Sequence, residues 1–140
     1  MAKQTHIWAK SLLRPLNQTN VQNTRDIGQA HESRALAHLQ NAGLTLVVRN
    51  YTAKVGEIDL IMAQQEALVF VEVRFRSAGS FVDGLSTVGD TKRKRFIKAV
   101  KYYLLMHPKD AQRVLRFDVM SMSTHDIDWH QNAFDAGSGW

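Results

Sequence analysis

Two acidic residues and an arginine lie at strand-like spacing between residues 56 and 76. Asp59 belongs to one stretch of alternating apolar and polar residues, and Glu72 and Arg74 belong to a second. A short polar segment, residues 63–67, separates the two stretches. Because alternation with a period of two is typical of half-buried strands, the segment predicts a β-hairpin with charged residues on both strands.

The expected register of this hairpin places Asp59 opposite Glu72. A symmetric turn centred between Gln65 and Glu66 pairs these two residues. Directly opposed residues have Cβ atoms about 5 Å apart, and like charges at that separation are destabilising. A bound cation, a proton or full hydration must relieve the repulsion, and Arg74 lies two residues along the same face. Two acids and a base on one face are typical of a metal-dependent phosphodiesterase site.

A third acid, Glu32, lies on a predicted helix. Residues 25–42 read as a helix that ends at Gly43. At helical spacing Glu32 falls inside the apolar stripe formed with Leu36 and Leu39. A buried carboxylate is costly unless it is paired or binds a metal. Glu32 is therefore either a structural residue bonded to the backbone or to an arginine, or a third member of the site.

Further elements complete a compact domain around the hairpin. Residues 44–51 predict a strand that makes a three-strand meander with it, and residues 113–122 predict a fourth strand. Residues 91–106 predict a second helix. The Gly- and Ser-rich residues 77–90 between the hairpin and this helix form a long loop, which is either a substrate-contacting flap or a plain mobile loop.

Basic residues crowd the first part of the predicted second helix. They are Lys92, Arg93, Lys94, Arg95, Lys98 and Lys101. Together they carry more positive charge than the net +5 of the whole chain. Such a run is either a solvated face or a phosphate-binding surface. We expect nucleic-acid backbone contacts from Lys92, Arg93, Lys94, Lys98 and Lys101.

Composition limits the class of protein. The chain has 140 residues, of which 44% are hydrophobic, and no cysteine. These values predict one domain in a reducing, cytoplasmic setting, and no apolar run approaches the ~20 residues of a membrane span. We expect a flexible basic arm at residues 1–24, with a transit peptide as the alternative, a single domain at residues 25–135 and a frayed tail at residues 136–140. In the last strand Asp118 is expected to be structural, paired with Arg116.

Three sequence features carry a resemblance to a known superfamily. They are GEIDLI beginning at Gly56, FVEVR ending at Arg74, and the upstream Glu32. Over residues 28–122 the chain resembles the PD-(D/E)xK nucleases and, more narrowly, the small bacterial YraN-like proteins, relatives of archaeal Holliday-junction resolvases. The resemblance implies an α/β fold with a restriction-endonuclease-like core, a mixed central sheet flanked by helices.

The resemblance also implies roles for the site residues. Asp59 and Glu72 would ligate a metal ion, and Glu32 would be an auxiliary catalytic acid or water-mediated ligand. Carboxylate ligands without cysteine favour Mg²⁺ or Mn²⁺. Arg74 stands where the superfamily usually has lysine. Since arginine stays charged, Arg74 could stabilise developing charge but could not act as a general base.

Three hypotheses about function follow. The first is a Mg²⁺-dependent endonuclease acting on branched or otherwise structured DNA, where the choice of DNA over RNA rests on the resemblance. The second is a non-catalytic nucleic-acid-binding module on the same fold. The third is a protein-interaction subunit whose basic helix meets an acidic partner. No membrane partner is expected, and the sequence leaves the oligomeric state open, a homodimer included.

Overall fold

The computed structural model describes residues 16–76 and 90–133. These ranges contain two α-helices, one short 3-10 helix and five β-strands. In chain order they are α1 (Leu16–Asn41), β1 (Thr45–Ala53), β2 (Gly56–Gln64), β3 (Ala67–Phe75), α2 (Asp90–Met106), η1 (Asp110–Gln112), β4 (Val114–Met122) and β5 (Ile127–His130). Neither α1 nor α2 is long and apolar enough to cross a membrane. Of the described residues, 31–76 and 90–133 belong to one compact unit, which holds the sheet, and 16–30 belong to another.

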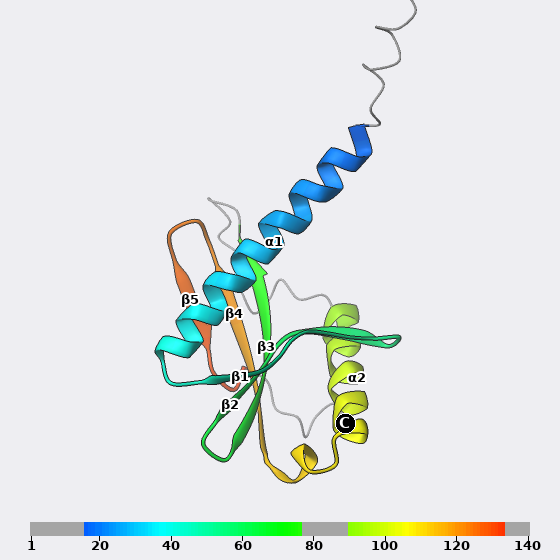
Figure 1. Ribbon diagram of the computed structural model, residues 1–140, viewed down its shortest axis with the longest axis vertical. Coiled ribbons are helices and arrows are strands. Elements are labelled where there is room, and N and C mark those ends of the chain that lie inside the picture. The colour runs from blue at the N-terminus through cyan, green and yellow to red at the C-terminus, as the bar shows by residue number, and fades with distance from the viewer. Residues whose placement is uncertain (1–15, 77–89, 134–140) are drawn as a thin grey trace, which may run out of the picture. The chain divides into compact units, whose positions relative to one another are not determined.

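The five strands form one mixed sheet in the order β1-β2-β3-β4-β5 (Figure 1). The first three strands are an antiparallel meander, β4 is parallel to β3, and β5 is antiparallel to β4. A parallel neighbour requires a crossover connection, and α2 lies in the connection from β3 to β4. The fold is therefore α/β, and the predicted meander and mixed sheet are confirmed.

The second half of α1 covers one face of the sheet. Ala35 and Leu39 are fully buried there against a cluster that includes Leu60, Val71 and Met120. These residues come from β2, β3 and β4, the three central strands. Because β3 is covered on both faces, its sequence is almost continuously apolar up to the charged residues at its end.

The helix α2 covers the opposite face (Figure 1). Its predicted apolar stripe is confirmed, since Phe96, Ala99, Val100 and Tyr103 are all buried. They pack against aromatic and aliphatic residues of the sheet, among them Phe70 of β3. The rings of Phe70 and Tyr103 meet edge to face at 5.9 Å. Nζ of Lys92, in the first turn of α2, lies 3.0 Å from Oε1 of Glu72, so the charged end of β3 lies under the beginning of α2.

Some boundaries differ from those expected. Helix α1 begins at Leu16, inside the segment expected to be an arm, while residues 1–15 lie outside the described residues. The expected flap at residues 77–90 and the tail at residues 136–140 also lie outside them, apart from Asp90, which begins α2. Strand β5 was not expected, because four residues are too few to establish an alternating pattern.

Asp118 is structural, as expected. It is fully buried, and its two carboxylate oxygens accept hydrogen bonds from Nε and Nη2 of Arg116, both at 2.9 Å. The indole N–H of Trp129 donates to the same carboxylate at 2.9 Å, and the backbone N–H of Asn132 donates at 3.0 Å. With four donors the carboxylate is satisfied and ties β5 to β4.

Candidate functional site

Strands β2 and β3 separate at Asp59. They pair in the register expected from the sequence as far as Leu60 opposite Val71. Beyond that pair, Oδ2 of Asp59 accepts a hydrogen bond from the backbone N–H of Val73 at 2.8 Å. The Asp59 carboxylate thus bonds to β3 one residue beyond Glu72, and the expected cross-strand pair of Asp59 with Glu72 is not part of the ladder.

The same point marks a change of face along β2. Strict alternation would place Ile58 beside Leu60, as the sequence predicts. Instead Leu60 packs in the cluster under α1, whereas Ile58 packs in the cluster under α2. The prediction of a single face for these residues was wrong because β2 turns toward α2 once its pairing with β3 ends.

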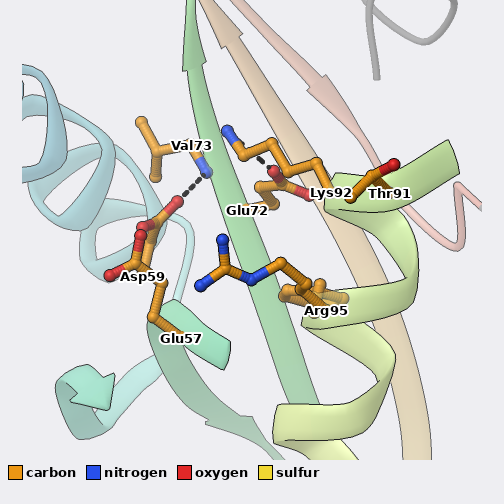
Figure 2. A pocket seen from close by; sticks show the side chains of 8 residues that line it. Glu57, Asp59, Glu72, Val73, Thr91, Lys92 and Arg95 are labelled. Atoms are coloured by element: carbon orange, nitrogen blue, oxygen red, sulfur yellow. Dashed lines mark hydrogen bonds and ion pairs between the residues drawn. The ribbon is translucent and has the colours of Figure 1, made fainter. Parts of the chain in front are cut away.

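A pocket of about 440 Å³ opens where the two strands part. Residues of β2, β3 and the first turns of α2 line it (Figure 2). They are Glu57, Asp59, Glu72, Val73, Thr91, Lys92, Arg95 and Phe96. Figure 2 shows Lys92 and Arg95 reaching from α2 toward the carboxylates of the two strands. The volume is within the range of about 300–1,000 Å³ that ligand pockets occupy.

Gly56 sets the distance between β2 and α2. A Cβ atom at this position would overlap the backbone carbonyl oxygen of Arg95. A helix backbone carbonyl cannot move aside as a flexible side chain can, so only glycine permits this approach. The contact therefore holds the first turns of α2, with Lys92 and Arg95, over the acidic side chains of β2 and β3.

Glu72 is shared by two cations. Its side chain is 4% exposed, and Oε2 accepts a hydrogen bond from Nη2 of Arg74 at 3.2 Å. Nζ of Lys92 lies 3.0 Å from Oε1. Oε1 nevertheless has no hydrogen-bond partner among the described residues, so the contact with Lys92 is an ion pair without hydrogen-bond geometry. Arg74 is buried beside Glu72 and does not line the pocket.

Asp59 is held in a setting that disfavours its charge. The pKa of this carboxyl is raised from 3.8 to about 7, mainly because burial disfavours the charged form, and the negative charges of Glu32 and Glu72 add to this rise. The hydrogen bond from Val73 and the positive charge of Lys92 act in the opposite direction. Desolvation is the largest cause, which is typical of acids at functional sites.

Glu32 lies near the site but does not line the pocket. Its charge acts on Asp59, and its side chain is 18% exposed, so it is largely buried as its place on the α1 stripe predicts. Nη2 of Arg49 approaches Oε2 of Glu32 to 3.8 Å, which is an ion pair, and no hydrogen bond reaches that oxygen from the described residues. The arginine pairing expected for Glu32 is present, whereas its membership of the site stays a prediction.

The pocket offers the carboxylates of Asp59 and Glu72 as oxygen donors for a cation. Within residues 16–76 and 90–133, no three His, Asp or Glu side chains are grouped closely enough to hold a metal ion. Magnesium, however, often binds through one or two carboxylates and keeps several waters. Asp59 and Glu72 would supply those carboxylates, and the buried Oε1 of Glu72 receives no hydrogen bond from the residues that the structure describes, only the ion pair with Lys92. Glu32 would act through water.

The predicted nucleic-acid-binding residues divide into two groups. Lys92 lines the pocket, whereas the other four lie on α2 outside it. These four are all exposed, and they are Arg93, Lys94, Lys98 and Lys101. Together with Arg95, Lys92 faces the acids, and the other four residues present a basic surface to solvent.

Three polar residues of the pocket were not singled out from the sequence. They are Glu57, Thr91 and Arg95. Glu57 lies two residues before Asp59, which strand periodicity would place on the same face. Lys92 lies one turn before Phe96, so extending the apolar stripe by one turn would have reached it, whereas Arg95 directly precedes Phe96 at the edge of the stripe.

Comparison with known sequences identifies a family and several relatives that match most of this chain. Residues 31–122 match the family described as "Uncharacterised protein family UPF0102". A UPF0102 protein of Saccharophagus degradans is 43% identical over 109 residues, which cover 78% of this chain and 92% of the relative. A UPF0102 protein of Legionella pneumophila is 42% identical over 116 residues, covering 81% and 98%. One of Paracidovorax citrulli is 45% identical over 118 residues, covering 81% and 86%.

Proposed function

This chain belongs to the UPF0102 family, and we propose that it is a metal-dependent phosphodiesterase that cleaves nucleic acid. One observation carries the proposal. Asp59 and Glu72 lie in one pocket with Lys92 and Arg95, so that acids able to hold a divalent cation face bases able to hold a phosphate. A perturbed acid in a pocket with convergent polar groups favours a catalytic site over a structural ion pair.

The first turn of α2 supports phosphate binding. Thr91 and Lys92 lie in that turn and line the pocket. Backbone N–H groups and the helix dipole at such an end favour an anion. The exposed Lys94 and Lys98 extend the positive surface away from the pocket, where they would meet neighbouring phosphates of a long substrate.

Each residue has a distinct part in this scheme. A divalent cation on Asp59 and Glu72 would lower the pKa of a bound water and polarise the scissile phosphate. Arg95 would neutralise charge that develops on the phosphate. Arg74 would hold Glu72 in place from beneath, since it is buried against that carboxylate and lies outside the pocket lining. The resemblance to junction-cleaving nucleases favours branched or structured DNA as the substrate.

The test is cleavage of four-way junction, flap, single-stranded and duplex DNA, each with an RNA counterpart, in Mg²⁺ or Mn²⁺. We expect the parent to cut at least one branched DNA and Asp59→Asn to lose that activity. The amide has nearly the shape of the carboxylate, so loss of activity with a melting temperature no lower than that of the parent isolates the chemistry. If the parent cuts nothing, or Asp59→Asn cuts equally well, the proposed function is wrong.

A second candidate, a nucleic-acid-binding module without catalysis, is favoured by one observation. Arg74 and Lys92 together already neutralise Glu72. In that case the two cations would take the place of a metal. Mn²⁺ distinguishes the candidates, because a ligand that binds only the folded state raises its melting temperature. A shift in the parent that Asp59→Asn abolishes favours the phosphodiesterase, and no shift in the parent favours the binding module.

A further inference from the structure

The two cations on Glu72 differ in how firmly they are held. The side chain of Arg74 is 8% exposed, and it hydrogen-bonds Oε2 from within the core. The side chain of Lys92 is 62% exposed, and its Nζ reaches Oε1 without hydrogen-bond geometry. An exposed lysine can exchange an ionic partner for water at little cost, whereas a buried arginine cannot. Glu72 therefore has one fixed partner and one exchangeable partner.

We propose that Lys92 is a displaceable counter-ion of Glu72, which leaves Oε1 when a divalent cation binds and then holds the substrate phosphate. The inference rests on the proposed function and makes Lys92 the cation that passes from Glu72 to the phosphate. Lys92 is better placed for it than Arg74, because Nζ lies at the pocket and Arg74 does not line it.

Electrostatics requires the exchange. A divalent cation on Glu72 would stand within a few ångströms of Nζ, and like charges so close repel strongly where water is partly excluded. Lys92 is free to respond, since its exposed stem can turn without opening the core. A phosphate in the pocket would give Nζ a new partner beside Arg95, which lies three residues along the same helix and therefore on the same side.

The experiment compares Lys92→Met with Lys94→Met. Both changes remove one positive charge from an exposed residue of α2, but only Lys92 lines the pocket. Isothermal titration with Mn²⁺ measures metal affinity, and the melting temperature without metal verifies folding. We expect Lys92→Met to bind Mn²⁺ about tenfold more tightly than the parent, as loss of a nearby like charge implies, and Lys94→Met to remain within about twofold.

Oligonucleotide binding in Ca²⁺, a cation that commonly replaces Mg²⁺ without supporting cleavage, gives a second readout. We expect Lys92→Met to bind DNA more weakly than the parent, Lys92→Arg to restore the binding, and Lys109→Met, a change at an exposed residue outside α2, to bind like the parent. Tight metal binding together with weak DNA binding is the signature of an exchangeable counter-ion, and a purely structural lysine would not produce it.

The outcomes separate this inference from the proposed function. If the parent binds Mn²⁺ and cleaves DNA but Lys92→Met has the same Mn²⁺ affinity as Lys94→Met, or a weaker one, the counter-ion role alone is overturned. If only Lys92→Met binds Mn²⁺, the cation does not displace Lys92 in the parent, and both the counter-ion role and metal-dependent catalysis are overturned. If no variant binds Mn²⁺, both are overturned.

Discussion

The backbone N–H of Val73 donates a hydrogen bond to Oδ2 of Asp59 at 2.8 Å, so a side-chain carboxylate replaces a main-chain acceptor at this position. The bond lies immediately beyond the last paired residues of β2 and β3. It fixes the orientation of one carboxylate oxygen, so the acid is positioned before any ligand arrives. It also keeps a backbone donor satisfied at the point where the sheet opens.

Asp59 should make the stability of the protein fall as pH rises. The pKa of its carboxyl is 3.8 in the unfolded chain and about 7 in the folded protein, so the native state binds more protons between these values. The contribution of Asp59 to the free energy of unfolding is therefore complete below about pH 4 and is lost as pH rises to about 7. This contribution is at most about 4 kcal/mol. Urea unfolding of the parent and Asp59→Asn in EDTA, from pH 4 to 8, should show this slope only in the parent.

The matched control for this experiment is Asp126→Asn, a change at an exposed residue between β4 and β5. It should keep the slope of the parent. A parent and an Asp59→Asn variant with parallel pH profiles would show that Asp59 titrates normally in the folded protein.

Gly56→Ala should destabilise the protein and separate α2 from β2. The added methyl group would overlap the carbonyl oxygen of Arg95, and overpacking of this kind costs about 1–3 kcal/mol. Gly28→Ala is the control, because nothing lies within 4 Å of a Cβ there and the helix should gain about 0.5–1 kcal/mol. Denaturant unfolding measures both, and equal stability of the two variants would exclude the close contact at Gly56.

The exposed lysines of α2 should contact phosphates. Duplex DNA affinity is expected to fall steeply as the salt concentration rises. Each phosphate contact adds about 0.9 to the steepness of the slope of log K against log salt concentration. Replacement of Lys94 and Lys98 by Ala should reduce the slope by about one to two. Replacement of Lys54 and Lys109, which are exposed outside α2, should leave it unchanged. Equal slopes in both double variants would remove this face from the binding surface.

Arg74→Ala should destabilise the fold because it leaves Glu72 buried without its fixed partner. Loss of one member of a buried ion pair costs about 3–5 kcal/mol, and Arg74→Lys should recover part of it. If a divalent cation binds Glu72, Mn²⁺ should reduce the loss by supplying another positive charge. Denaturant unfolding of both variants with and without Mn²⁺ measures this, and an unchanged unfolding free energy in Arg74→Ala would contradict a structural role.

The local elements were predictable from the sequence because they depend on local patterns. Alternation fixed the strands of the hairpin and its register, and helical periodicity fixed the buried stripe of α2. The pairing of Asp118 with Arg116 was also predictable, since the two residues lie two positions apart on one face of a strand.

The composition of the pocket was not predictable in the same way. Lys92 and Arg95 reach the acids because the backbone of Gly56 contacts α2, and a contact between distant segments leaves no periodic signal. The turn of β2 toward α2 at Asp59 also depends on this contact between distant segments. Alternation assumes an undistorted strand, whereas Ile58 packs in the cluster under α2 and Leu60 packs in the cluster under α1.

The parallel pairing of β3 with β4 has a consequence for folding kinetics. It joins Ala67 to Val114, so its formation must close a chain segment that includes all of α2. The β2–β3 hairpin closes only a short turn, and local pairings form faster than those that need a long loop. We therefore expect Asp59 and Glu72 to be brought together early in folding, and Lys92 to join them only in the slow step that docks α2 and β4.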